Sequence, residues 1–164
     1  MERRVRQFTL ITQNVDGLHG KAGSRNLLEI HGSIWKVRCP RCGIVTDNFD
    51  VPIQILPVCD QCSGLLRPNV VWFGEMLPQA ELYAAQLAAT QCDLMFVIGT
   101  SGVVQPAASF AVIAKRAGAY VVEVNIEYTP LSNVVERTCI GKAAEVLPEL
   151  IEAWSSFAGH PLVV

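Results

Sequence analysis

Four cysteines in two closely spaced pairs restrict the fold of this chain more than any other feature of its sequence. Cys39 and Cys42 form the first pair and Cys59 and Cys62 the second, in a C-x2-C-x16-C-x2-C pattern. Two residues between cysteines let the backbone turn so that both sulfurs face one ion, and a glycine shortly after each pair relieves the tight turn. The spacing is typical of a four-thiolate metal site.

We expect the metal to be zinc, ahead of iron, and its role to be structural. Four protein sulfurs fill a tetrahedral shell and leave no position for water. The alternative interpretation is a pair of disulfides. The first apolar run, Phe8 to Ile11, is short and ends in polar residues, so it does not resemble a secretory signal. We therefore expect a cytoplasmic protein, and disulfides are rare in the cytoplasm. Cys92 and Cys139 lie outside the pattern and border apolar runs, as buried thiols do.

Composition favours a compact domain, with room for a small insertion. Of the 164 residues, 51% are hydrophobic and 17% are charged, which excludes a disordered chain. The formal net charge of −2 gives no argument for binding nucleic acid or an anionic membrane surface. The stretch from Leu94 to Ala114 lacks charged residues and imitates a membrane span. Glycine, serine, glutamine and proline interrupt it, so we expect a strand, a turn and a helix start instead.

The second half of the chain has the periodicity of an α/β protein. Residues 94–98 form a continuous apolar run, as in a strand buried on both faces of a parallel sheet. A helix over 106–118 and a strand over 119–124 complete a βαβ unit. The spacing also predicts a strand over 8–12, a helix over 79–90, a short strand over 137–140 and a helix over 143–154.

Polar residues follow three of the predicted strands directly. In doubly wound sheets, ligands bind outside the carboxyl ends of the strands, and acidic residues there hold ribose hydroxyls. Thr100 and Ser101, near a helix start, offer backbone amides to a phosphate. Together these clusters predict a nucleotide site, and they are Gln13-Asn14-Val15-Asp16, Gly99-Thr100-Ser101 and Asn125-Ile126-Glu127.

Two histidines are candidates for proton transfer, because an imidazole titrates near neutral pH. His31 lies between an apolar strand and Gly32, which leaves one side of the ring open to a ligand. His19 follows a loop and is more simply a structural residue.

Several motifs in order resemble one family. TQNVDGLH, EIHGS, the two CxxC pairs, VVWFGE, GTSGVVQPA and NIE occur in the order and at the spacing of the sirtuins, which are NAD-dependent protein-lysine deacylases. The likeness extends from Thr9 to Trp154 and is closest to the bacterial type.

The resemblance implies a partial Rossmann-like parallel sheet with a small zinc-ribbon insertion. The NAD-binding domain would comprise 1–33 and 67–155, the zinc-binding module 34–66, and a tail 156–164. The implied reaction transfers the acyl group of an acyl-lysine protein or peptide to the ribose of NAD, releasing nicotinamide and O-acyl-ADP-ribose. Neither nucleic acid nor a membrane is an implied partner.

The resemblance also implies roles for individual residues. His31 would be the general base that activates a ribose hydroxyl. Substrate peptide would add as a strand beside the WFGE segment. The implied cofactor-binding residues are Gln13, Asn14, Asp16, Gly99, Thr100, Ser101, Asn125, Ile126, Glu127 and Ala143, and the implied substrate-binding residues are Val71, Phe73, Gly74 and Glu75.

Sirtuins carry a central strand and a glycine-rich phosphate loop before the first strand seen here. Seven residues precede Phe8, so we expect the sequence as printed to lack that loop. The alternative hypothesis is therefore a catalytically inactive, zinc-stabilised binding or interaction module derived from a sirtuin.

Overall fold

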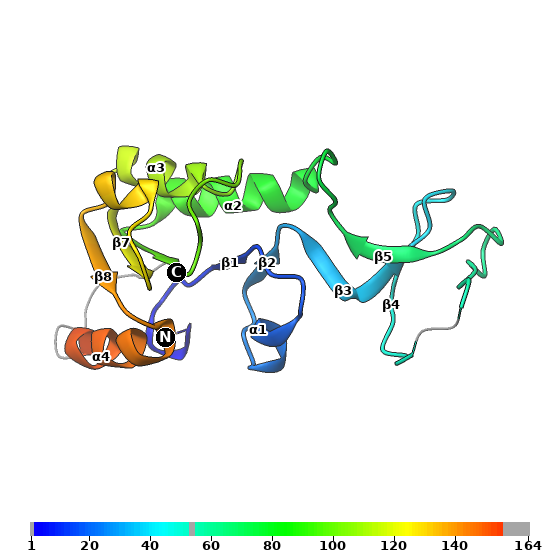
Figure 1. Ribbon diagram of the computed structural model, residues 1–164, viewed down its shortest axis with the longest axis horizontal. Helices are drawn as coiled ribbons and strands as arrows, with labels where there is room; N and C mark the ends of the chain where they lie inside the picture. The colour runs from blue at the N-terminus through cyan, green and yellow to red at the C-terminus, as the bar shows by residue number, and fades with distance from the viewer. Residues whose placement is uncertain (1, 53–54, 156–164) are drawn as a thin grey trace. The chain divides into compact units, whose positions relative to one another are not determined.

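The computed structural model of the chain describes residues 2–52 and 55–155 and divides into two compact units (Figure 1). We call Met1–Ile11 with Tyr83–Val164 the parallel-sheet unit, and Thr12–Leu82 the cysteine unit. The predicted NAD-binding domain, 1–33 with 67–155, and the predicted zinc-binding module, 34–66, have other boundaries than these units and stay predictions. The predicted tail, 156–164, lies outside the described residues.

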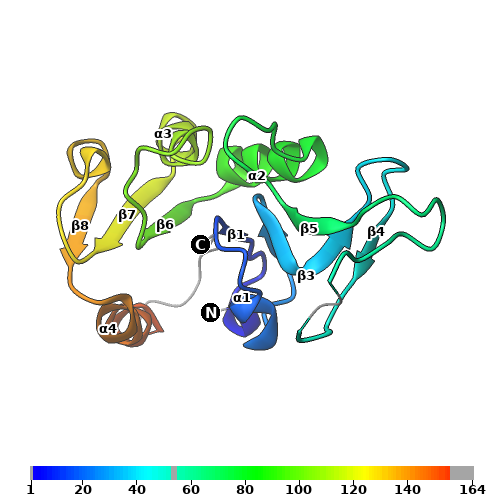
Figure 2. The ribbon, with the colours of Figure 1, turned by 45° about the vertical axis from the view of Figure 1, so that its right-hand side comes forward.

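Three parallel strands form the sheet of the parallel-sheet unit, in the order β6-β7-β8 (Figure 2). They are β6 (Leu94–Ile98), β7 (Tyr120–Asn125) and β8 (Arg137–Ile140). The predicted strands over 94–98 and 137–140 are confirmed at both ends, and β7 starts one residue later than predicted. The parallel α/β architecture expected from the sequence is therefore present.

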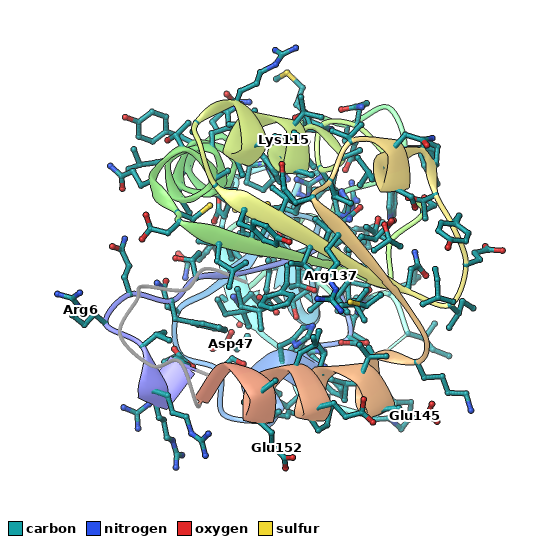
Figure 3. All side chains as sticks on the ribbon, turned by 90° about the vertical axis from the view of Figure 1, so that its left-hand side faces the viewer. Arg6, Asp47, Lys115, Arg137, Glu145 and Glu152 are labelled. Carbon is teal, nitrogen blue, oxygen red and sulfur yellow. The ribbon has the colours of Figure 1, made fainter. Side chains whose placement is uncertain are left out.

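Helices cover both faces of this sheet. Figure 3 shows α3 (Ser109–Arg116), which carries Lys115, on one face and α4 (Ala143–Ser155), which carries Glu145 and Glu152, on the other. The α3 face buries Phe110, Ala111 and Ala114, and Val121 and Val124 of β7 are fully buried. Two 3-10 helices, η1 (Glu2–Arg4) and η2 (Pro130–Asn133), complete the unit.

The α3 helix starts three residues later than predicted. Pro106 has no amide hydrogen, and the carbonyl of Pro106 accepts a hydrogen bond from the Ser109 hydroxyl at 2.6 Å. The residues from Pro106 to Ala108 therefore form a turn. The helix α2 (Gln79–Gln91), in contrast, begins at the residue that the sequence predicts.

The cysteine unit is built on a three-stranded antiparallel sheet in the order β4-β3-β5. Its strands are β3 (Gly32–Arg38), β4 (Val45–Asp47) and β5 (Arg67–Val70). Pro68 lies inside β5. Because β5 is an edge strand of this sheet, a residue without an amide hydrogen is tolerated there.

Short elements connect this sheet to the first strand of the chain. The strand β1 (Leu10–Thr12) pairs with β2 (Leu27–Glu29), and the Ile30 amide donates to the Thr12 carbonyl at 3.2 Å. Between them lies the one-turn helix α1 (Leu18–Lys21), in a glycine-rich segment.

No helix within residues 2–52 and 55–155 is long and apolar enough to cross a membrane. The uncharged run from Leu94 to Ala114 forms β6, a turn and the first part of α3.

Candidate functional site

Four cysteine sulfurs meet in the cysteine unit. The sulfurs of Cys39, Cys42, Cys59 and Cys62 all lie within 4.8 Å of one another. The Sγ–Sγ distance is 3.4 Å between Cys39 and Cys62 and 3.6 Å between Cys42 and Cys59. Both distances are too long for a disulfide. They are close to the spacing of about 3.8 Å between sulfurs bound tetrahedrally to zinc at 2.3 Å.

The two CxxC turns share one backbone pattern. The amide of Cys39 donates to the Ile44 carbonyl, and the amide of Gly43 donates back to the Cys39 carbonyl, both at 2.9 Å. In the second turn, Cys59 is bonded in the same way to Gly64 and Ser63, at 2.8 Å and 2.7 Å. The repeated hydrogen bonds hold each pair of sulfurs on one side of its turn.

The surroundings of Cys39 favour its thiolate form, which is the form that binds a metal. Hydrogen bonds from the backbone amides of Cys42 and Arg41 lower the pKa of the Cys39 thiol to about 7. The neighbouring Cys39 sulfur and burial instead raise the pKa of the Cys62 thiol to about 12. At Gly64, a Cβ would lie 3.1 Å from the Cys39 sulfur, so glycine leaves space for the cluster. The donor set, the spacing and the backbone turns all fit one structural zinc ion.

His31 follows β2 and is held in a defined orientation. Its Nδ1 lies 3.0 Å from the carbonyl oxygen of Gln13. A carbonyl can only accept, so Nδ1 carries the hydrogen in the neutral ring and Nε2 bears the lone pair. The side chain of His31 is half-buried, next to the fully buried Ile30. Nε2 is therefore the basic nitrogen of the ring, because Nδ1 is already hydrogen-bonded to Gln13.

Gly32 lets the chain turn tightly after this histidine. Its φ is +77°, and a Cβ would lie 2.0 Å from the Asn69 carbonyl oxygen. The chain thus brings β5 against the backbone beside His31, and the Val71 amide donates to the His31 carbonyl at 2.9 Å.

The other polar residues predicted near His31 belong to the same unit. Asn14 is exposed, and its amide donates to the Thr12 hydroxyl at 3.1 Å. Asp16 is half-buried; its Oδ1 accepts from the Leu18 amide at 3.0 Å and its carbonyl accepts from Trp35 Nε1 at 2.7 Å. The structure thus brings Gln13 directly to His31, while the Asp16 side chain accepts from Leu18, the first residue of α1.

The predicted substrate segment continues from β5. Val71 is half-buried, whereas Phe73, Gly74 and Glu75 are exposed. The Phe73 side chain is fully exposed, at 103%. Glu75 accepts hydrogen bonds from Arg38 and Arg67, neither of which was predicted as a site residue.

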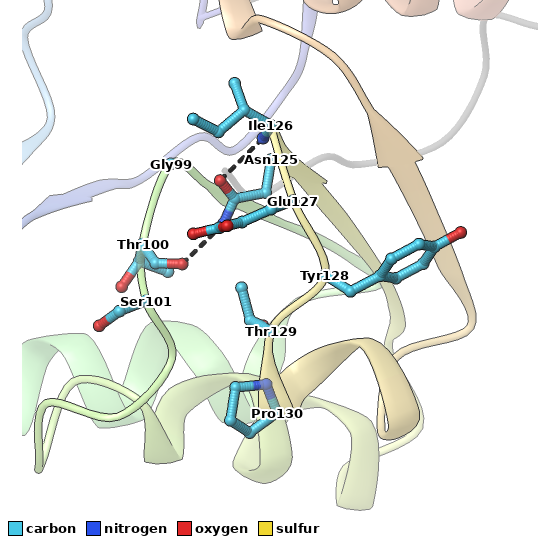
Figure 4. Close-up of a pocket in the computed structure, with 9 residues that line it drawn as sticks. All are labelled: Gly99, Thr100, Ser101, Asn125, Ile126, Glu127, Tyr128, Thr129 and Pro130. Carbon is cyan, nitrogen blue, oxygen red and sulfur yellow. Dashed lines mark hydrogen bonds between the residues drawn. The ribbon is translucent and has the colours of Figure 1, made fainter.

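The parallel-sheet unit contains a cavity of about 380 Å³ at the carboxyl ends of β6 and β7 (Figure 4). Six of its lining residues were predicted from the sequence: Gly99, Thr100, Ser101, Asn125, Ile126 and Glu127. The Asn125 side-chain amide donates to the Thr100 carbonyl at 2.8 Å, which ties the two strand ends together. The ends of β6 and β7 therefore meet around one cavity, as the sequence predicted for a nucleotide site.

Three further lining residues, Tyr128, Thr129 and Pro130, were missed. Thr129 and Ser132 form a capping box around Pro130 at the start of η2. The sequence carries a signal for such a cap: a threonine, a proline at the next position and a serine three residues after the threonine. Tyr128, Thr129 and Pro130, which we call the rim, could therefore have been predicted. The predicted residue Ala143 starts α4 and is not one of the nine lining residues.

The candidate residues thus form two groups. Gln13, Asn14, Asp16, His31, the 71–75 segment and the cysteine cluster belong to the cysteine unit, and the cavity residues with Ala143 belong to the parallel-sheet unit.

Residues 1–106 match the model of the Sir2 family. The chain belongs to the Sir2 family. This confirms the resemblance to the sirtuins that the ordered motifs indicated.

Relatives in the Sir2 family are similar over most of this chain. It is 53% identical over 144 residues to NAD-dependent protein deacylase 2 of Pyrobaculum aerophilum, which covers 87% of this chain and 57% of that protein. A solved Sir2 homologue in complex with NAD has a TM-score of 0.87 at 46% identity and covers 92% of this chain and 59% of its own. A mutant Sir2 homologue in complex with 2'-O-acetyl-ADP-ribose has a TM-score of 0.90 at 46% identity, covering 98% and 65%. The chain thus spans about three fifths of the length of these Sir2 proteins.

Proposed function

We propose that the chain takes part in NAD-dependent removal of acyl groups from protein lysines, giving nicotinamide and O-acyl-ADP-ribose. The observation that carries this proposal is the orientation of His31. The Gln13 carbonyl occupies Nδ1 at 3.0 Å, so Nε2 is the nitrogen left to take a proton. Similar Sir2 proteins, solved with NAD and with 2'-O-acetyl-ADP-ribose, support the choice of cofactor and product.

When bound, NAD supplies a ribose carbon that loses nicotinamide as the acyl oxygen bonds to it. His31 would then accept a ribose hydroxyl proton at Nε2, making that oxygen nucleophilic. Gln13 and Asn14 would contact this ribose, and Asp16 the nicotinamide amide. Because the Gln13 carbonyl accepts the Nδ1 hydrogen, it also stabilises the charged ring that forms.

The cavity of the parallel-sheet unit has groups suited to the phosphates and adenosine of NAD. The exposed backbone of Gly99 and Ser101 would border the phosphates. Glu127 lines the cavity with a carboxylate, a group that accepts from ribose hydroxyls. Asn125 would contact the same ribose, with Ile126 beside it, and Ala143 the adenine.

The substrate would be an acyl-lysine segment in extended form. Val71, Phe73 and Gly74 continue from the edge strand β5, and the exposed Phe73 ring offers apolar area to a peptide that adds there. Glu75 belongs to the same segment.

Zinc at the four cysteines would hold the cysteine unit together without entering the reaction. All four thiols are free, as expected for a protein of the reducing cytoplasm, and we propose that location. Fractionation of the native source with an antibody to the chain tests it.

Calorimetric titration with NAD, combined with chromatographic detection of nicotinamide released from NAD and an acetyl-lysine peptide, tests the proposal. We expect binding, and release that is lost in His31→Gln. His19→Gln is the matched control, because it removes the other histidine of the same unit. Turnover that survives His31→Gln would refute the assignment of the base.

A second candidate is an inactive, zinc-stabilised binding module. The observation that favours it is that all four metal-binding residues lie in one compact unit, which needs no catalysis to persist. Binding of NAD or peptide without release of nicotinamide would support this candidate instead.

A further inference from the structure

Glu75 is held between two arginines in the cysteine unit. Arg38 Nη2 lies 3.1 Å from each of its carboxylate oxygens. Arg67 reaches the same carboxylate with two nitrogens, Nη1 at 2.5 Å from Oε1 and Nη2 at 3.3 Å from Oε2. Two guanidinium groups thus converge on one carboxylate, and without it the two positive charges would face each other.

The same carboxylate also shapes the backbone of the predicted substrate segment. Oε2 of Glu75 accepts from the Trp72 amide at 3.0 Å, and the Glu75 amide donates to the Trp72 carbonyl at 2.9 Å. These two bonds close the turn that contains Phe73 and Gly74. The Gly74 φ of +86° is one that glycine adopts without strain.

Arg67 fixes the other side of this turn. Its guanidinium carbon lies 3.3 Å from the ring centroid of Trp72, and Nη2 donates to the Val70 carbonyl at 2.8 Å. One arginine therefore contacts β5, the Trp72 ring and Glu75 together. Lysine could carry the charge, but it has no planar fork with which to make all three contacts.

Arg38 connects the turn to the cysteine cluster. It is the last residue of β3, and the next residue is Cys39. Arg41, in the first CxxC turn, connects it to the second turn, because Arg41 Nη1 donates to the Cys62 carbonyl at 3.1 Å. The ion pair between Arg38 and Glu75 thus runs from the edge of the metal site to the substrate segment.

We propose that Glu75 is a positioning residue, which holds the Trp72–Gly74 backbone and the exposed Phe73 ring in the shape that receives an extended acyl-lysine peptide. This proposal rests on the proposed function. In it, Glu75 acts through the turn that it holds and does not contact the substrate itself. The carboxylate is already bonded to two arginines and one amide, whereas Phe73 is fully exposed. The peptide would therefore meet the ring and the backbone.

The charge of Glu75 is maintained through the neutral range. Hydrogen bonds from Arg67 and then from the Trp72 amide lower the pKa of this carboxyl to about 2. The Arg38 and Arg67 charges that face it act in the same direction.

Glu75→Gln in the zinc-loaded chain tests the proposal with two measurements. An amide nitrogen would then face the arginine donors, so we expect the Trp72 amide to exchange its hydrogen about tenfold faster or more. The Val71 amide, which is bonded to His31, should keep its rate within about twofold, because its partner is unchanged. We expect the Kd of a fluorescein-labelled acetyl-lysine peptide to rise by about tenfold.

Glu136→Gln is the matched control. Glu136 also accepts from a basic side chain and a backbone amide, but it lies in the parallel-sheet unit. This variant should leave peptide affinity and Trp72 exchange as in the wild type. If Glu75→Gln fails to fold, Arg67→Lys keeps the charge and should change both measurements in the same direction.

The outcomes separate this inference from the proposed function. If wild type binds the peptide and Glu75→Gln binds it equally well, the positioning role is refuted. Unchanged Trp72 exchange in Glu75→Gln refutes it as well. If wild type binds no peptide, the assignment of this segment to peptide binding is refuted, and the positioning role is refuted with it.

Discussion

Glu123 is a fully buried carboxylate in the middle of β7. It accepts hydrogen bonds from the hydroxyls of Thr129 and Ser132, and from that of Thr138 at 3.3 Å. Thr129 lines the cavity, and Ser132 belongs to η2 directly after it. A buried carboxylate thus holds the rim of the candidate nucleotide site.

Removing one hydroxyl at a time should separate stability from the shape of this rim. Ser132→Ala and Thr138→Val each remove one hydrogen bond to the same carboxylate, and Ser132→Ala also removes the bond from the Thr129 amide. Thr138→Val should lower the free energy of unfolding by about 1 kcal/mol, and Ser132→Ala should lower it by more. Only Ser132→Ala should weaken ADP-ribose binding, because Ser132 Oγ also accepts from the amide of the rim residue Thr129 at 2.9 Å, whereas Thr138 lies on β8. Thermal unfolding and calorimetry measure the two effects, and equal loss of affinity in both variants would contradict the assignment.

Gly32 is the glycine that the site requires most. Gly32→Ala should destabilise the cysteine unit by more than about 3 kcal/mol, because the φ strain of about 1–2 kcal/mol is added to a clash with the Asn69 carbonyl. Gly23→Ala is the matched control: its φ is +93°, and nothing lies within 4 Å of the added Cβ. It should cost the strain alone. Urea denaturation compares the two, and similar losses would contradict the role of the close approach.

At the scale of elements, Glu136, which directly precedes β8, connects α3 to β7. Lys115 Nζ lies 2.9 Å from Glu136 Oε1, and Oε2 of Glu136 accepts from the Val121 amide at 2.7 Å. The hydrogen bond from Lys115, followed by that from the Val121 amide, lowers the pKa of the Glu136 carboxyl below its ordinary value of 4.5.

This lowered pKa predicts how the stability of the parallel-sheet unit depends on pH. A carboxyl whose pKa is lower in the folded state stabilises that state above its unfolded pKa, and the contribution is lost as the pH falls through the folded value. The melting temperatures of wild type and Glu136→Gln should therefore differ at pH 7 and converge as the pH falls below about 4.5. A difference that stays constant down to strong acid would contradict this prediction.

The elements themselves were predictable where one local rule decides them. The apolar run of β6 and the helix α2 agree with the sequence because burial on both faces and helical periodicity are local signals. Proline cannot donate to a strand ladder, so Pro68 taken by itself favours a break in a strand. Whether a strand lies at an edge, where this does not matter, depends on distant pairing partners.

At the scale of the whole molecule, the chain divides into two units with different sources of stability. The parallel-sheet unit is stabilised by apolar side chains that are buried between its helices and its sheet. The cysteine unit has short strands, and several of its large apolar side chains are exposed, including Phe49 at 70% and Val51 at 80%. Such a unit needs a metal or another cross-link to fold.

Metal analysis should therefore find about one zinc per chain, and chelation should unfold the cysteine unit while β7 amides keep their protection from exchange. Cys42→Ser should lose the metal. Cys92→Ser is the control, because Cys92 is a buried thiol outside the cluster, and burial raises its pKa. An iron absorption spectrum, or a cysteine unit that withstands chelation, would contradict the zinc assignment.

The sequence by itself determined the chemistry of this protein: the four sulfurs, the histidine after an apolar strand, the polar strand ends and the family that joins them. These follow from residue type and short spacing, which are local. The tertiary structure alone decided which groups share a partner. Arg38 and Arg67 meet at Glu75, and Thr129, Ser132 and Thr138 meet at Glu123. Such shared contacts depend on strand pairing and loop closure between residues that are far apart in the sequence. A carboxylate that accepts from several such residues produces no periodic pattern in the sequence.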